Sequence, residues 1–188
     1  GGSHHATFDF GAGYCVFNDT AVAANYLKNK KFAKKILILD LDVHQGNGTA
    51  SIFRNNKDVF TCSVHGAKNY PFRKEVSDYD VSMEDNCSDS VYIEEIKSLL
   101  PKLYDKIMPD FIFYLCGVDI LESDKLGRLG MSITGCKKRD ELVIDHYRNK
   151  NIPVATVIGG GYSKDHAELA DRHSIIFDVA FKYFKKKN

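Results

Sequence analysis

The sequence predicts an α/β fold with a mostly parallel sheet that carries helices on both faces. Four short apolar runs, rich in β-branched residues, have the pattern of buried parallel strands and lie at 36–39, 59–64, 111–116 and 154–158. Helical patterns alternate with these runs, as is typical of a parallel sheet covered on both sides. Each run also ends abruptly in polar residues or glycines, which is where such sheets bind ligands.

The helices follow from apolar spacing and from capping residues. Residues 19–30 have apolar positions at helical spacing and follow Asn18, a residue type that caps helix N-termini. Residues 88–106 form an amphipathic pattern that Pro101 should interrupt, because proline has no backbone N–H. Two further helices are expected, the second with a lysine-rich end that favours its dipole, over 134–150 and 165–185. The intervening segment 68–85 has no clear period, and a loop of this length suggests a binding role.

Length and composition exclude several classes of protein. The 188 residues are 44% hydrophobic and 27% charged, which is globular composition and suits one α/β domain. The 26 Lys and Arg residues against 25 Asp and Glu leave a net charge of +1, so charge gives no general reason to bind nucleic acid or a membrane. No apolar run approaches the roughly 18–20 residues that a bilayer span needs. We therefore expect neither nucleic acid nor membrane as a partner.

Cysteine usage favours a cytoplasmic protein. An odd number of cysteines with no CxxC pair fits reduced, mostly buried thiols better than a disulfide framework. The start of the chain shows no basic and apolar signal-peptide pattern. A cysteine nucleophile is the less favoured interpretation of these five residues, which are Cys15, Cys62, Cys87, Cys116 and Cys136.

Two carboxylates and one histidine at the strand ends predict a metal site. Asp42 and His44 follow the first apolar run, and on an extended segment they would point to the same face. Asp119 follows the third run. Three protein ligands with an open fourth position are the arrangement of a catalytic zinc site. The alternative is that Asp40 and Asp42 cap the following loop while His44 only packs.

Two more groups of residues fit the same site. The pair His4-His5 could be the remnant of an expression tag, but a native glycine-rich loop and a helix follow it directly. A histidine close to a metal can act as a general base and later return the proton to the leaving group. The glycines at 159–161 lack the Lys-Ser/Thr of a phosphate-binding loop. We expect them to aim Tyr162 into the site, where its hydroxyl could donate to an oxyanion.

The joint pattern of these motifs resembles the zinc-dependent histone deacetylases of the arginase/deacetylase superfamily. The similarity extends over nearly the whole chain, and the stretches 44–48, 119–127 and 137–143 are most similar to the class IV branch and its bacterial relatives. It implies a three-layer arginase/deacetylase fold and hydrolysis of acyl-lysine amides. The matching motifs are His4-His5, Gly13-Tyr14-Cys15, the stretch from Asp40 to Gly48, Gly117-Val118-Asp119 and Gly160-Gly161-Tyr162.

The resemblance also implies cofactors and a substrate channel. Asp42, His44 and Asp119 would bind Zn²⁺, although an Asp₂His site also accepts Fe²⁺. A structural K⁺ would be held, mostly through backbone oxygens, by Asp40, Asp42, His44, Ser63 and Val64. The acyl-lysine channel would be formed by Gly13, Tyr14, Phe72, Leu126, Gly160 and Gly161.

The catalytic groups implied by the resemblance are His4, His5, Asp40, Asn47 and Tyr162. His5 would be the general base and acid, Asp40 would orient His4, and Tyr162 would stabilise the oxyanion. Asn47 departs from class I members, which carry an aspartate there. Because an amide cannot raise the basicity of His5 as a carboxylate would, the pKa of His5 should be lower.

The chain also departs from the family at its N-terminus. Family members begin well before the tandem histidines, so we expect residues 1–188 to be a single catalytic domain that lacks the usual N-terminal portion. Three alternatives remain. The chain could act on an acetylpolyamine or another small amide, or it could be an incompetent fragment or pseudoenzyme that binds acyl-lysine or a protein. A two-manganese ureohydrolase would need more carboxylates than this motif offers.

Overall fold

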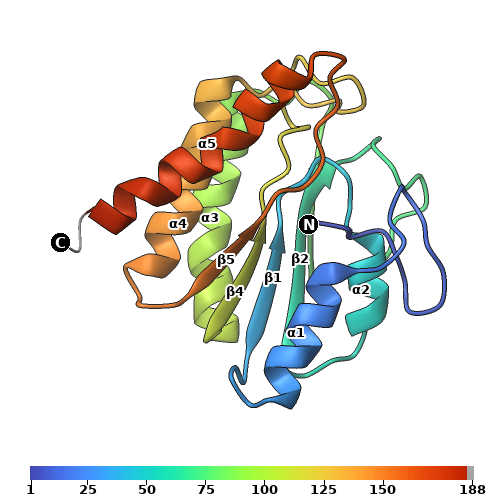
Figure 1. Ribbon diagram of the computed structural model, residues 1–188, viewed down its shortest axis with the longest axis vertical. Helices are drawn as coiled ribbons and strands as arrows, with labels where there is room; N and C mark the ends of the chain where they lie inside the picture. Colours follow the sequence, from blue (N-terminus) through green and yellow to red (C-terminus); the bar gives the residue numbers. More distant parts are fainter. Residues whose placement is uncertain (186–188) are drawn as a thin grey trace.

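The computed structural model describes residues 1–185 and contains a five-stranded sheet in the order β3-β2-β1-β4-β5. Figure 1 shows β2, β1, β4 and β5 side by side. Every pair of neighbouring strands is parallel. The four predicted strands are present, and the α/β prediction is confirmed. The strands are β1 (Ile36–Asp40), β2 (Val59–Gly66), β3 (Tyr79–Met83), β4 (Phe111–Leu115) and β5 (Val154–Val157).

Helices cover both faces of this sheet and make three layers. Figure 1 shows α1 and α2 on one face and α3, α4 and α5 on the other. Because side chains alternate along a strand, Ile36 and Ile38 of β1 join one hydrophobic core and Leu37 and Leu39 join the other. The helices are α1 (Asp19–Asn29), α2 (Asn47–Phe53), α3 (Asp89–Ile107), α4 (Ile133–Arg148) and α5 (His166–Lys185).

The strand order places a topological switch point between β1 and β4. From β1 the chain continues outward to β2 and β3, whereas β4 and β5 lie on the other side of β1. Asp40, the last residue of β1, is in register with Leu115, the last residue of β4, and with Ser63 of β2, which continues to Gly66. Connections leave β1 and β4 in opposite directions, and the crevice between them is the usual ligand site of such sheets.

Two elements correct the sequence prediction. Strand β3 lies inside segment 68–85, which was expected to be a loop throughout. It is an edge strand paired only with β2, and its alternating burial from Tyr79 to Met83 is too short a pattern to distinguish from a polar loop. Helix α2, which has only seven residues, was not predicted. It begins at Asn47, inside the motif that extends from Asp40 to Gly48. A helix this short shows too few turns for a clear apolar period.

The long helix α3 also differs from expectation, because it continues through Pro101. Pro101 is exposed, as is Lys97 one turn earlier, so the Lys97 carbonyl that lacks an N–H partner lies on the solvent side. The predicted cap of α1 is confirmed, since the Asn18 side chain accepts from the Ala21 backbone N–H at 2.9 Å. The last residues of the predicted basic end, at 186 and 187, lie outside the described residues.

The described residues also bear on the cysteines and on membrane insertion. All five cysteines are free, four of them buried and Cys15 partly exposed. None of the described helices combines the length and the apolar character that a transmembrane segment requires.

Candidate metal centre and catalytic site

The structure brings Asp42, His44 and Asp119 together at the switch point. Nδ1 of His44 lies 3.1 Å from Asp42 Oδ1 and 3.0 Å from Asp119 Oδ2. One donor atom from each residue lies within 4.8 Å of the others, and all three side chains are buried. Burial opposes a charged imidazole, but hydrogen bonds to Asp119 and Asp42 outweigh it and raise the pKa of His44 to about 10. Two buried carboxylates around one imidazole are a suitable ligand set for a divalent metal.

The loop geometry around these residues corrects one expectation. Strand β1 ends at Asp40, and residues 42–44 form a bend instead of an extended segment. Inside this bend Asp42 Oδ1 accepts the His44 backbone N–H at 2.9 Å, while Asp119 Oδ1 accepts the Val43 N–H at 3.0 Å. These hydrogen bonds hold the bend in shape. The side chains of Asp42 and His44 therefore lie on the same side of the loop, although the segment is not a strand. Loop capping and metal ligation are therefore compatible.

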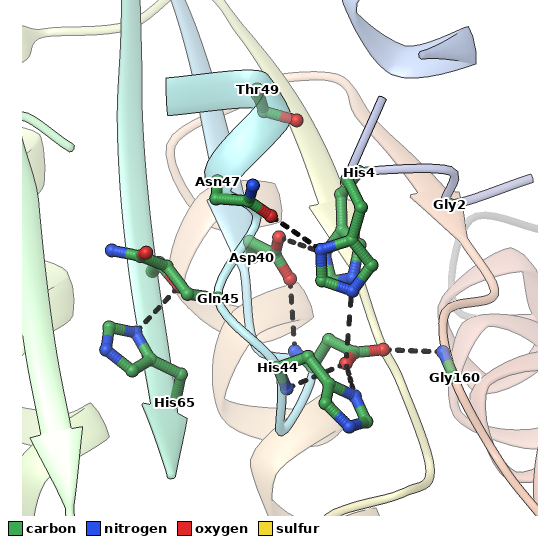
Figure 2. A network of polar contacts seen from close by, with 12 residues as sticks. Gly2, His4, Asp40, His44, Gln45, Asn47, Thr49, His65 and Gly160 are labelled. Carbon is green, nitrogen blue, oxygen red and sulfur yellow. Dashed lines mark hydrogen bonds and ion pairs between the residues drawn. The ribbon is translucent and has the colours of Figure 1, made fainter. Parts of the chain in front are cut away.

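Two glycines leave the space that the carboxylates occupy. A Cβ on Gly117 would lie 2.3 Å from Asp42 Oδ2, and a Cβ on Gly160 would lie 1.9 Å from Asp119 Oδ2. The backbone N–H of Gly160 instead donates to Asp42 Oδ2 at 2.5 Å (Figure 2). No side chain could be added at either position without displacing a carboxylate. The residues present thus fit a metal ion, with the donor atoms held from several directions.

The tandem histidines lie beside this cluster and have different partners. Figure 2 shows His4 close to Asp40 and His44. Nδ1 of His4 lies 2.6 Å from Asp40 Oδ2, and Nδ1 of His5 lies 2.7 Å from the amide oxygen of Asn47. Both rings are buried, and the His4 carbonyl accepts the Thr49 backbone N–H at 3.1 Å. Such integration into the fold favours native residues over a tag remnant at His4-His5.

Their electrostatic environments separate the two histidines. Burial opposes a charge on His4, but Asp40 and Asp42 outweigh it and raise the pKa of His4 to about 9. Burial and the neighbouring charge of His4 lower the pKa of His5 to about 3. At neutral pH one imidazole is therefore charged and its neighbour is neutral. A neutral imidazole can accept a proton, which is the requirement for a general base.

Tyr162 completes the group from the loop after β5. Its backbone N–H donates to Asp124 Oδ2 at 2.6 Å, and its ring meets the His44 ring edge-on with centroids 6.0 Å apart. Burial and the nearby carboxylates of Asp42 and Asp119 raise the pKa of Tyr162 above its usual range. The hydroxyl consequently remains protonated and able to donate a hydrogen bond.

A cavity of about 580 Å³ adjoins these groups. Four of the predicted channel residues line it together with His5, His44 and Tyr162, and these four are Gly13, Tyr14, Phe72 and Leu126. Gly160 and Gly161 are not among its lining residues. Gly160 supports Asp42 as described, and a Cβ on Gly161 would meet side chains of Val118 and α5. The two glycines therefore lie behind the metal-site carboxylates and against α5, and they do not line the predicted substrate channel.

Two charged residues that support the site were missed from the sequence. Asp124 is buried and accepts the backbone N–H groups of Leu126, Gly127 and Tyr162. Arg139 of α4 is fully buried and donates from Nη1 to the Leu41 and Gly117 carbonyls at 3.2 and 2.7 Å. Those carbonyls precede the candidate metal ligands Asp42 and Asp119 in the loops after β1 and β4. The one sequence signal for Arg139 was its charge at an inward-facing position of the helix predicted over 134–150.

The predicted K⁺ residues lie on neighbouring segments. Asp40 is the register partner of Ser63, and both are buried. Asp42 and His44 follow Asp40 in the next loop, and Val64 follows Ser63 in β2. The K⁺ site itself stays a prediction.

Comparison with known proteins identifies the family. The profile of the histone deacetylase domain matches residues 1–175, which is most of the chain. The chain belongs to the histone deacetylase family. It is 42% identical over 180 residues to an uncharacterized protein of Picosynechococcus sp., covering 96% of this chain and 60% of that protein. It is also 31% identical over 172 residues to histone deacetylase 2 of Arabidopsis thaliana, covering 90% of this chain and 44% of that one.

Solved structures of histone deacetylase relatives share the fold. The HDA15 HD domain superposes with a TM-score of 0.77 at 27% identity, covering 94% of this chain and 54% of that chain. An acetylpolyamine aminohydrolase from Burkholderia pseudomallei gives a TM-score of 0.78 at 26% identity, covering 94% of this chain and 53% of that chain. The predicted three-layer arginase/deacetylase fold is therefore confirmed. This chain spans roughly half of each of these longer relatives.

Proposed function

We propose that this chain forms the catalytic part of a metal-dependent enzyme that hydrolyses acyl-lysine amides to lysine and a carboxylic acid. The observation that carries the proposal is the convergence of Asp42, His44 and Asp119 next to a neutral, buried His5, beside a cavity. Membership in the histone deacetylase family supports amide hydrolysis as the reaction class.

The residues would divide the chemistry among them. Asp42, His44 and Asp119 would hold a divalent ion such as zinc, which when bound supplies Lewis acidity towards the acyl carbonyl and the attacking water. His5 keeps its Nδ1 on Asn47, so Nε2 is free to take a proton from the water and later deliver it to the departing lysine amine. Tyr162 would donate a hydrogen bond from its hydroxyl to the developing oxyanion.

His4 would act through its charge. Paired with Asp40, it stays protonated at neutral pH and places a positive charge beside His5. Burial and that charge together keep the pKa of His5 low, so His5 is unprotonated when water must be activated. The positive charge also favours negative charge that develops on the substrate.

A zinc-replete assay with a fluorogenic acyl-lysine peptide tests this proposal. Tyr162→Phe should keep its metal but lose about 10²–10³-fold in kcat, as removal of one oxyanion donor does in other hydrolases. Tyr26→Phe is the matched control, because Tyr26 is exposed on α1 and does not line the cavity. An unchanged kcat in Tyr162→Phe would exclude the role assigned to the tyrosine. Absence of turnover by a metal-loaded chain would favour the binding-module alternative.

The acetylpolyamine alternative is supported by one observation, the structural similarity to an acetylpolyamine aminohydrolase. A substrate panel distinguishes it from the main proposal. We expect acetyl-lysine peptide or a longer acyl-lysine to be cleaved with the higher kcat/KM, and a monoacetylated polyamine with the lower. The reverse ranking would make the small amide the substrate.

A further inference from the structure

The lining of the cavity has an unusual charge. Three cationic side chains contribute to it, Lys68 from the turn after β2 and Lys125 and Arg128 from the segment after β4. No aspartate or glutamate of the described chain is among its lining residues. Apart from His5 and His44 at its base, the remaining lining is apolar or uncharged, with Tyr14 and Phe72 each 91% exposed.

Carboxylates near the opening do not cancel this charge. Asp85 Oδ2 is shared by two cations, at 2.7 Å from Arg128 Nη2 and 3.5 Å from Lys68 Nζ. The Lys68 and Arg128 side chains remain 62% and 53% exposed. Within the described residues Lys125 has no ion pair, and neighbouring Asp124 is buried with its oxygens turned to backbone N–H groups. Asp85 and Asp124 together supply two negative charges against three cations, so the opening keeps an excess of positive charge.

The base of the cavity adds no negative charge once a metal is bound. Asp42 and Asp119 together carry two negative charges, which a divalent ion balances. A substrate that enters therefore meets apolar walls and an excess of positive charge. Because charges at a cleft opening steer encounter and raise or lower association rates by roughly 10–10³-fold, they should select among substrates with the same scissile amide.

We propose that this opening selects acyl-lysine amides flanked by acidic residues and disfavours polycationic substrates. The inference deepens the proposed function and rests on it. A protonated polyamine, or a peptide rich in lysine and arginine, would bring further ammonium or guanidinium groups against Lys68, Lys125 and Arg128. Aspartate or glutamate beside the acyl-lysine would instead pair with those side chains, while the acyl-lysine stem packs between Tyr14 and Phe72.

The test uses three peptides that share one acyl-lysine and differ only in flanking residues, which are acidic, neutral or basic, together with a monoacetylated polyamine. With the zinc-loaded protein, kcat/KM should be about 10-fold or more higher for the acidic peptide than for the basic one. The ratio should shrink as ionic strength rises, because salt screens exposed charges. Fluorescence anisotropy of labelled peptides measures the same preference in binding, independently of turnover.

Charge reversal supplies the matched variants. Lys125→Glu should reduce or invert the ratio, and Arg128→Glu should do the same. Lys102→Glu should leave the ratio unchanged, since Lys102 is exposed on α3 near the opposite end of the sheet. Equal or better use of the basic peptide or the polyamine, a ratio unaffected by Lys125→Glu, or no binding of any peptide would overturn the inference. Binding with the predicted preference but no cleavage would refute the proposed hydrolysis and leave the charge selection standing.

Discussion

Nδ1 of His4 lies 2.6 Å from Oδ2 of Asp40, and both side chains are buried. The adjacent His5 meets an uncharged amide, that of Asn47, at a similar distance of 2.7 Å. Two consecutive histidines thus have nearly the same hydrogen-bond geometry and opposite charge states. The pair provides a fixed positive charge and a neutral proton acceptor side by side.

Asn47→Asp should raise the pKa of His5, because a carboxylate in contact favours the charged imidazole by about 1–3 pKa units. The acid limb of kcat/KM against pH would move to higher pH, since His5 must be unprotonated to act as the base. Histidine ring signals followed by NMR measure the pKa without any turnover. Asn29→Asp on the exposed surface of α1 is the control. An unshifted His5 titration in Asn47→Asp would contradict the electrostatic account.

Metal binding should stabilise the fold through Asp119. A ligand at about 100 times its Kd adds about 2.7 kcal/mol, which for a chain of this size corresponds to a rise of about 5–10 °C in Tm. Asp119→Asn should abolish that rise, whereas Asp58→Asn, which alters an exposed ion pair with Lys28, should preserve it. Thermal melts with zinc and with a chelator, together with metal analysis, provide the measurement. A stoichiometry near two per chain would revive the two-metal ureohydrolase alternative.

Arg139 should be a major determinant of stability even without metal. Its guanidinium is paired with Asp140 inside the fold and donates to the loop carbonyls of Leu41 and Gly117. Arg139→Met leaves Asp140 buried without its cation, and breaking such a pair costs about 3–5 kcal/mol. Arg128→Met, which breaks an exposed pair with Asp85, should cost less than about 1 kcal/mol.

Urea unfolding in the presence of a chelator compares these two variants. The double variant Arg139→Met with Asp140→Leu should recover part of the loss, because it removes the uncompensated charge. Equal stabilities for Arg139→Met and Arg128→Met would show that the buried pair does not hold the loops.

His65 should make stability depend on pH below neutrality. The ring is 1% exposed with Nδ1 at 3.0 Å from Ser63 Oγ, and burial lowers its pKa to about 4. Between pH 6.5 and about 4 the unfolded chain binds a proton that the folded chain does not, so stability is lost as pH falls through this range. The loss would reach at most about 3 kcal/mol. The loss of stability between pH 7 and pH 4.5, measured by urea unfolding, should be smaller in His65→Gln than in the unmodified protein. Equal losses in the two proteins would exclude His65 as the cause.

Much of the fold followed from local pattern. The run Ile36 to Leu39 predicted a buried parallel strand, because a strand covered on both faces is apolar at nearly every position. Edge strand β3 escaped notice, since its alternating residues from Tyr79 to Met83 resemble a polar loop. The α3 helix through Pro101 could not be predicted either, because the cost of proline depends on whether the freed carbonyl faces water.

The sequence by itself determined which chemical groups this protein has for its site. The motif residues Asp42, His44 and Asp119, the histidine pair and Tyr162 could all be named from residue type, spacing and family resemblance. Only the tertiary structure decided their charge states and their common location. A pKa depends on burial and on charges from distant parts of the chain, as for His4 beside Asp40. The same holds for the cavity opening, where Lys68, Lys125 and Arg128 line one cavity only because the tertiary structure brings together the segments after β2 and β4.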